Sequence, residues 1–151
     1  MTKVLIVEAR FYPEVADELL AGAMGALREG GVVCDRISVP GAFEIPAVIA
    51  MAVRAAKNRD NQGAYDGFLA LGCVIRGETS HYDYVCAESA RKLQDLACDH
   101  AVAVGYGILT CETMAQAQAR ADRDGHNKGG AVAEACLRMI EIRRGFGLAD
   151  Q

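Results

Sequence analysis

The sequence has no apolar run of the roughly 18 residues that a membrane-spanning helix requires. Its N-terminus carries only a short apolar stretch with no cleavage-like segment after it, so we expect no secretory signal. Positive charge is also in deficit, because 16 Lys and Arg residues stand against 20 Asp and Glu residues and the net charge is −4. Such a chain is a poor partner for nucleic acid or for an anionic membrane. We therefore expect a cytoplasmic protein that binds neither, and any anion site on it must be local.

Metal and redox motifs are missing as well, since no two cysteines have C-x-x-C spacing. Most cysteines fall within apolar periodicity, which favours reduced core thiols over the alternative of metal or redox chemistry. The three histidines lack the spacing of ligands, so we expect no metal site, with His100 and His126 at the surface. The six cysteines are at positions 34, 73, 86, 98, 111 and 136.

The chain has no internal repeat, low-complexity tract or linker, and its 151 residues suit one core. Four strand-like runs are each followed by a helical pattern, which predicts βαβ units and a parallel sheet with right-handed crossovers. We expect residues 1–151 to form a single α/β domain, a three-layer, flavodoxin-like sandwich with a four-stranded parallel sheet. The expected strands are 3–9, 32–39, 67–75 and 101–109, and the expected helices are 13–29, 43–58, 80–99, 113–123 and 127–144.

The segment 45–53, IPAVIAMAV, is apolar on every side of its predicted helix. A helix on the surface of a protein normally shows one polar face, so a helix without one has two apolar neighbours. In a domain of this size we expect the second neighbour to be another subunit. A deeper position in the core is the alternative.

Residues 72–85, GCVIRGETSHYDYV, pass abruptly from a buried strand to polar residues and then to a helix. Ser80 followed by Asp83 predicts a capping box, which starts the helix at Ser80 and places His81 in the first turn. The glycine-containing turn offers free backbone N–H groups and the positive end of the helix dipole, so we expect an anion site to which Arg76 adds charge. The same dipole favours a neutral imidazole, which can act as a base. Taken alone, the turn is better explained as an ordinary helix cap with a solvated histidine.

Other unusual side chains follow the predicted strands, whose carboxyl ends hold ligands in sheets of this kind. Phe11 comes after the first strand, where an aromatic ring can stack on a planar ligand. Glu44 comes after the second strand and can accept hydrogen bonds from hydroxyls or amines. Singly, each of these residues, and each of the basic Arg120, Arg123 and Lys128, is best explained as a solvated side chain or a cap. Together with the anion site and its base they indicate a planar polar substrate and a phosphorylated one.

Four segments resemble the lumazine synthase family of riboflavin biosynthesis, in the same order along essentially the whole chain. They are VPGAFEIP at 39–46, GCVIRGETSHYDYV at 72–85, GILTCE with the following Q-A-x-x-R at 107–120, and NKGG at 127–130. The resemblance implies condensation of 5-amino-6-(D-ribitylamino)uracil with 3,4-dihydroxy-2-butanone 4-phosphate. The implied products are 6,7-dimethyl-8-ribityllumazine, phosphate and water, and neither a cofactor nor a metal is implied.

The resemblance also implies roles for single residues, with His81 as the proton-transfer residue and Phe11 stacked on the pyrimidine. The ribityl chain and the pyrimidine edge are expected against two short runs, Ala42, Phe43 and Glu44, and the backbone of Cys73, Val74 and Ile75.

The phosphate-bearing substrate is expected at the turn formed by Gly77, Glu78 and Thr79. A neighbouring subunit is expected to supply Tyr106 over the ring, Arg120 to the phosphate and Lys128 near the site. The resemblance thus implies self-association with a site shared between adjacent subunits of a pentamer.

This sequence departs from common patterns of the family in several places. Tyr106 stands where Phe is frequent, which keeps a stacking ring and adds a hydroxyl. Tyr12 stands where Asn is frequent, and the sequence does not say what this alters. The turn 124–126 also differs from the glycine pattern of many shell-forming members. The first strand begins almost at the N-terminus, whereas capsid-forming members usually carry a further segment there, so we expect a free homopentamer rather than an icosahedral shell.

Two other functions compete with this one. A non-catalytic flavin- or lumazine-binding or shell-forming protein on the same fold would need no base beside an anion site, so His81 argues against it. A cysteine-dependent enzyme would use Cys73, Cys86 or Cys111, and it would be sensitive to thiol alkylation.

Overall fold

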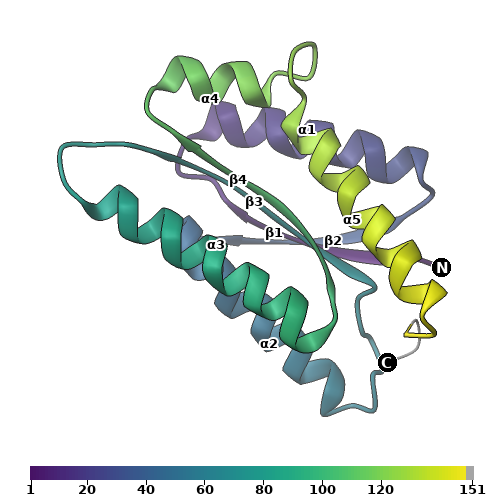
Figure 1. The fold of residues 1–151 in the computed structure, drawn as a ribbon. Coiled ribbons are helices and arrows are strands. Elements are labelled where there is room, and N and C mark those ends of the chain that lie inside the picture. The colour runs from purple at the N-terminus through teal and green to yellow at the C-terminus, as the bar shows by residue number, and fades with distance from the viewer. Residues whose placement is uncertain (149–151) are drawn as a thin grey trace.

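Four parallel strands form one sheet at the centre of the molecule (Figure 1). The computed structural model describes residues 1–148. The order of the strands is β2-β1-β3-β4, so the chain starts inside the sheet, crosses to one edge and returns past β1 to the other. Their bounds are Lys3–Ala9 for β1, Val33–Val39 for β2, Gly67–Ile75 for β3 and Ala103–Cys111 for β4.

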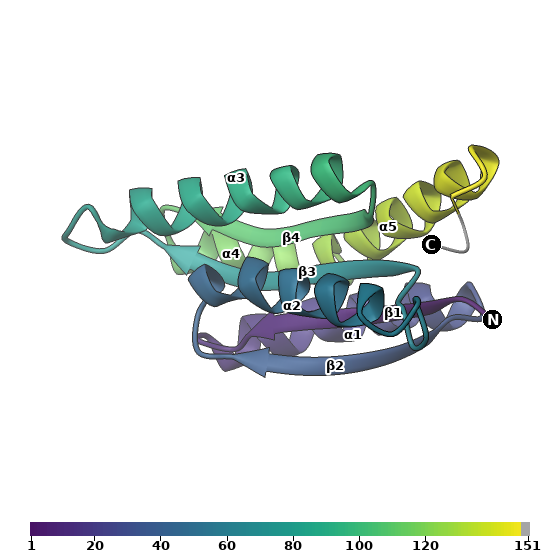
Figure 2. The same cartoon turned by 90° about the horizontal axis from the view of Figure 1, so that it is seen from below.

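Helices cover both faces of the sheet, as Figures 1 and 2 show. On one face lie α1 (Pro13–Glu29), α4 (Met114–Ala121) and α5 (Lys128–Gly145). On the other lie α2 (Ile45–Lys57), which follows the short 3₁₀ turn η1 (Ala42–Glu44), and α3 (His81–His100). This is the predicted three-layer, flavodoxin-like α/β sandwich with a four-stranded parallel sheet. Within residues 1–148, none of the helices combines the length and the apolar character needed to cross a bilayer.

The central strands supply side chains to two cores, one on each face of the sheet. Leu5 and Val7 of β1 pack with α2 and α3, whereas Val4 and Ile6 pack with α1 and α5. Because both faces are covered, a central strand appears in the sequence as a continuous apolar run. This explains why residues 67–73 of β3 are all buried.

Most predicted elements have the predicted bounds to within a residue or two, with β1, α1 and β3 exact. The last strand is the main difference, since it lies at Ala103–Cys111 instead of 101–109. The helix before it continues to His100, and Ala101 then adopts a left-handed conformation with φ of 52°. The chain reverses at this residue and pairs with β3 only from Ala103 onward.

The outward face of α2 remains apolar and exposed in the protomer. Ile45, Ile49 and Val53 are buried against the sheet. On the other side of the helix, Met51 is 66% exposed and Ala50 is also exposed. Within residues 1–148, the sheet and α3 pack on the inner side of α2, whereas Ala50 and Met51 stay uncovered.

The NKGG segment packs α5 directly onto the backbone of α1. Asn127 adopts a left-handed conformation with φ of 44°, and its Oδ1 accepts a hydrogen bond from the Gly130 N–H at 3.3 Å. A Cβ at Gly129 would overlap the backbone carbonyl of Leu19. A glycine is therefore required at position 129 for this close approach, which fixes the start of α5 and with it Lys128.

We expect Gly129→Ala to destabilise the protein by about 1–3 kcal/mol, because the added methyl group must push two helix backbones apart. Gly25→Ala is a matched control in α1, since nothing lies within 4 Å of a Cβ at that position. It should stabilise the helix by about 0.5–1 kcal/mol. Chemical denaturation of both variants measures the two effects, and equal effects would contradict the close packing at Gly129.

Candidate active site

A cavity of about 510 Å³ lies at the carboxyl ends of β1, β2 and β3. This is the edge of a parallel sheet at which the ligands of such folds bind. Ten of the predicted site residues line it, and most of its wall is apolar. These ten are Phe11, Ala42, Phe43, Glu44, Cys73, Val74, Ile75, Gly77, Thr79 and His81.

Phe11 gives the cavity a flat aromatic wall. Its side chain is 71% exposed, and its ring meets that of Tyr12 edge to face, with the centroids 5.0 Å apart and the planes at 72°. The Tyr12 ring is half-buried and packs against the core cluster that includes Val15 and Cys73. One face of the Phe11 ring therefore remains available for stacking on a planar ligand.

A buried charge network holds the turn that presents Phe11. Glu8 is only 2% exposed, and its Oε1 accepts a hydrogen bond from Arg10 Nη1 at 2.7 Å. Arg10 also pairs with Asp17 of α1, and the hydrogen bond that Arg10 donates to Glu8 is the largest cause that raises the Arg10 pKa. Burying a carboxylate is costly unless it is paired, so Arg10 is held toward Glu8. This arrangement fixes the connection from β1 to α1.

The turn η1 forms the next part of the wall. Its Ala42 is buried, whereas Phe43 is 57% exposed and Glu44 is also exposed. The Glu44 N–H donates to the Gly41 carbonyl at 3.2 Å, which folds the turn tightly at the end of β2. The Glu44 carboxylate consequently lies at the cavity, where it can accept hydrogen bonds from hydroxyl or amine groups.

The end of β3 offers backbone groups rather than side chains. Its pairing with β1 stops at the pair Glu8 and Leu71, whereas its pairing with β4 continues to the pair Ile75 and Cys111. Residues 72–75 therefore lack a strand partner on the β1 side. Backbone N–H and C=O groups that point to that side can bind a planar heterocycle through its edge.

The β3–α3 turn and the first turn of α3 complete the cavity with polar groups. His81 is the first helical residue and is exposed at the cavity, together with Gly77 and Thr79. The His81 backbone N–H lies 3.4 Å from Thr79 Oγ1. The Asp83 N–H donates to the Ser80 carbonyl at 3.0 Å, and the positive end of the helix dipole lies at this turn, which suits a phosphate.

The predicted capping box of Ser80 and Asp83 is wrong. Ser80 is the N-cap residue, but its side chain makes no capping hydrogen bond. The Asp83 carboxylate is instead paired with Arg76, with Nη2 and Oδ1 3.1 Å apart. A charge-assisted pair is stronger than a hydrogen bond to a neutral backbone N–H, so the arginine prevails.

Contrary to expectation, Arg76 does not add its positive charge to the anion site. Its Nε lies 2.8 Å from Glu112 Oε2, and its Nη2 pairs with Asp83. The guanidinium carbon also lies 4.3 Å from the centroid of the Tyr82 ring. Two carboxylates thus neutralise this side chain, and Arg76 is not among the residues that line the cavity.

Four predicted site residues do not reach the cavity within one protomer. Glu78 is exposed on the β3–α3 turn. Tyr106 lies on the edge strand β4 beside α3, Arg120 donates to the Gln116 carbonyl at 3.2 Å on α4, and Lys128 begins α5. The last three are those expected from a neighbouring subunit, and that part stays a prediction.

Sequence reasoning also missed residues that line the cavity. Tyr82 and Val85 of α3 and Pro40 and Gly41 after β2 contribute to the wall, as does Tyr12. Val85 lies four residues after His81, on the same face of α3, so helical periodicity could have found it. Tyr82 directly follows His81 and lies on a different face, so that signal does not identify it.

Comparison with known proteins decides the family of this site. The sequence pattern that defines the 6,7-dimethyl-8-ribityllumazine synthase family matches residues 1–144. The 6,7-dimethyl-8-ribityllumazine synthase of Agrobacterium fabrum is 56% identical over 144 residues, which cover 95% of each chain. This chain belongs to the 6,7-dimethyl-8-ribityllumazine synthase family.

Further family members agree over the same length. The 6,7-dimethyl-8-ribityllumazine synthase of Paramagnetospirillum magneticum is 47% identical over 150 residues, 99% of this chain and 100% of its own. The 6,7-dimethyl-8-ribityllumazine synthase 1 of Rhizobium meliloti is 55% identical over 145 residues, 95% of this chain and 93% of its own. The likeness to lumazine synthases therefore includes every segment that forms the cavity.

Buried thiols lie beside the site of this lumazine synthase family member. Burial raises the pKa of Cys73 to about 12, and it also raises the pKa values of Cys86 and Cys111. A thiol with a raised pKa supplies almost no thiolate at neutral pH and is a poor nucleophile. Cys98 on α3 is the exposed thiol. These environments argue against a cysteine-dependent mechanism.

We expect iodoacetamide at mildly alkaline pH to alkylate Cys98 and to leave Cys73 and Cys111 unmodified, because only exposed thiolates react quickly. Peptide mapping by mass spectrometry identifies the labelled positions, and Cys98→Ser is the control that removes the fast-reacting thiol. Labelling of Cys73 before Cys98 in the folded protein would contradict the burial described above.

Proposed function

We propose that this cavity condenses 5-amino-6-(D-ribitylamino)uracil with 3,4-dihydroxy-2-butanone 4-phosphate to form 6,7-dimethyl-8-ribityllumazine, phosphate and water. The chain belongs to the lumazine synthase family and is thus a transferase of riboflavin biosynthesis. The observation that carries the assignment of the site is the meeting of Phe11, Glu44 and His81 around one cavity at the strand ends. The alternative of a non-catalytic binding or shell-forming protein is not favoured by the names of the relatives.

The pyrimidine is placed between an aromatic face and a backbone edge. Phe11 stacks on its ring, and the unpaired edge of residues 72–75 binds its polar rim. The ribityl chain extends along η1, where Ala42 and Phe43 give apolar contact and Glu44 accepts hydrogen bonds from hydroxyls. The exposure of Phe11 and Phe43 in the protomer supports this arrangement, because both present surface that a ligand can cover.

The phosphate of the second substrate is placed at the start of α3. Gly77, Glu78 and Thr79 form the turn around it, and the helix N–H groups donate to its oxygens. Arg76, at the start of the same turn, is already neutralised by two carboxylates. The phosphate dianion of the ketone therefore needs another cation. Arg120 of an adjacent subunit fills this role, with Lys128 nearby.

His81 transfers protons during the reaction. The amine of the pyrimidine first attacks the ketone carbonyl and forms an imine with loss of water. Phosphate then leaves as a neighbouring carbon loses a proton, and ring closure releases water again. His81 stands in the first turn of α3, between the phosphate region and the cavity that holds the pyrimidine, and can accept and return these protons.

We further propose a cytoplasmic homopentamer whose sites lie between adjacent subunits. The exposed apolar face of α2, with Met51, is surface that a second chain can cover. The unpaired thiols of all six cysteines suit a reducing compartment.

The first test is the assay itself with His81→Ala. We expect the rate of lumazine formation, above the uncatalysed condensation, to fall on the order of a hundredfold, because general acid–base catalysis contributes at least this much. His100→Ala is the control, since His100 ends the same helix and lies beside Lys57, away from the cavity. Fluorescence of the lumazine product measures the rate. An unchanged rate in His81→Ala would remove its assigned role.

The second test concerns the shared site. Arg120→Ala should raise the KM for the phosphorylated ketone about 10- to 100-fold, the effect of losing a charge-assisted hydrogen bond. Mixed oligomers refolded from His81→Ala and Arg120→Ala chains should regain activity at a low ketone concentration, at which each parent variant is nearly inactive, because some sites then combine an intact His81 with an intact Arg120. No recovery would place both residues in one protomer.

Mass in solution should be near five times the 16.1 kDa chain.

A further inference from the structure

One arginine joins three segments that surround the proposed phosphate region. Arg76 ends the β3 side of the turn, and its backbone N–H donates to the Cys111 carbonyl at 2.9 Å. Its side chain reaches Asp83 in the first turn of α3 at 3.1 Å and Glu112 in the β4–α4 connection at 2.8 Å. The guanidinium group also covers the Tyr82 ring at 4.3 Å. A planar group with several donors can satisfy all of these contacts at once.

Asp83 lies where its carboxylate could cap the start of α3, so its pairing with Arg76 affects that helix start. Asp83 is the third residue of α3, the position from which a carboxylate folds back onto the N-cap backbone N–H in a capping box. Ser80 is an N-cap residue able to complete that box. In the structure neither side chain caps the helix, because Arg76 holds the carboxylate away. The helix start is therefore left without an anion of its own.

We propose that Arg76 is a positioning residue that keeps the start of α3 open to the phosphate of the ketone. It does so by withdrawing Asp83 from the helix start and by fixing the turn that carries Gly77 and Thr79. This inference rests on the proposed function of the cavity. Without Arg76, the Asp83 carboxylate would accept hydrogen bonds from the backbone N–H groups at the start of α3, and it would repel the phosphate dianion.

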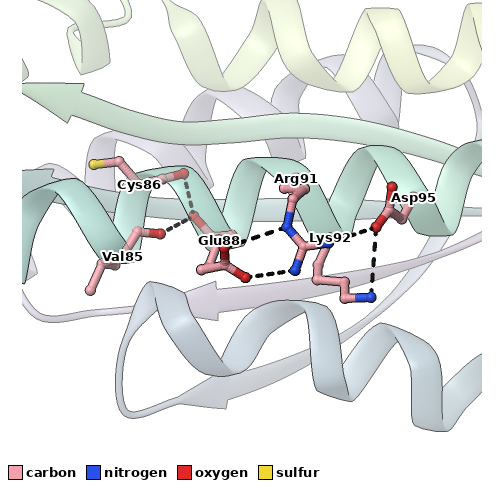
Figure 3. A network of polar contacts seen from close by, with 7 residues as sticks. Val85, Cys86, Glu88, Arg91, Lys92 and Asp95 are labelled. Carbon is pink, nitrogen blue, oxygen red and sulfur yellow. Dashed lines mark hydrogen bonds and ion pairs between the residues drawn. The ribbon is translucent and has the colours of Figure 1, made fainter.

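The same helix provides a matched comparison, shown in Figure 3. Arg91 also pairs with two carboxylates, with Nη2 2.7 Å from Glu88 Oε2 and Nη1 3.3 Å from Asp95 Oδ2. These three residues lie further along α3 and do not line the cavity. Exposed ion pairs of this kind contribute little to stability. Loss of either arginine should therefore lower stability slightly and to the same extent. Only loss of Arg76 should weaken binding of the phosphate.

The test is steady-state kinetics of Arg76→Gln and Arg91→Gln, with each substrate varied in turn. We expect Arg76→Gln to raise the KM for the phosphorylated ketone about tenfold, with the KM for the pyrimidine unchanged, as for loss of one charge-assisted hydrogen bond. The inhibition constant of inorganic phosphate should rise by the same factor. Arg91→Gln should change none of these. An unchanged ketone KM in Arg76→Gln, or an equal rise in Arg91→Gln, would overturn the proposal.

A second substitution separates positioning from simple stabilisation. In the Arg76→Gln background, Asp83→Ala removes the carboxylate that would occupy the helix start, so it should lower the ketone KM back toward the wild-type value. A merely structural role predicts the opposite, since the double variant loses more contacts. Arg76→Lys serves if Arg76→Gln does not fold, and it should give an intermediate KM because an ammonium group cannot span both carboxylates in the same way.

These outcomes are distinct from failure of the proposed function. A wild-type protein that forms no lumazine would contradict the function of the cavity. An active wild-type protein with the wild-type ketone KM in Arg76→Gln would contradict only the role of Arg76. Circular dichroism and mass in solution confirm that each variant keeps its fold and assembly.

Discussion

The cavity depends on the unequal lengths of two neighbouring strands. β3 continues for four residues past its last pair with β1, to Ile75, while β4 still pairs with it on the other side. The chain leaves β1 at Arg10, where the buried Glu8 and the helix residue Asp17 hold it, and Phe11 stands where β1 would have continued. An aromatic ring and an unpaired backbone edge are thereby placed side by side at the same cavity. The electrostatic cost of burying Glu8 is part of this geometry, because the Arg10 side chain that pairs with Glu8 Oε1 also turns the chain, while Glu8 Oε2 has no hydrogen-bond partner within residues 1–148.

Local signals in the sequence were sufficient for most of the fold. Pro13 at the start of α1 and the capping box of Thr113 and Gln116 in α4 act within a few residues, so pattern reasoning can find helices there. The apolar runs of β1 and β3 reflect coverage on both faces and identify central strands directly. Phe11, Glu44 and His81 at the cavity follow from one rule, that carboxyl ends of parallel strands share an edge, whereas the other predicted residues there came from the resemblance to the lumazine synthase family.

The errors come from contacts and backbone conformations that local sequence patterns do not reveal. Ser80 and Asp83 satisfy the local rule for a capping box, but Arg76 pairs with the Asp83 carboxylate instead, and Arg76 is itself held by Glu112, 36 residues further along the chain. Ala101 adopts a left-handed backbone conformation that delays the start of β4. The sequence gives no sign of this, because the position is an alanine and not a glycine or asparagine. Glu8 sits within an apolar run, so its pairing with Arg10 appears only when β1 is folded. The places of Tyr106, Arg120 and Lys128 relative to the cavity cannot come from one chain if a second chain completes the site.

The unpaired edge of β3 has a consequence for how this site can change during evolution or design. Recognition through backbone atoms does not depend on which side chains the same residues carry. The positions at the end of β3 can therefore accept substitutions that keep the packing intact. The pattern of donors and acceptors offered to the heterocycle is then set by the relative lengths of β1 and β3. Single substitutions cannot easily rewrite it, whereas an insertion or deletion that slides the end of β1 would alter it at once. Adapting this scaffold to another heterocycle is consequently a problem of strand length more than of side-chain choice.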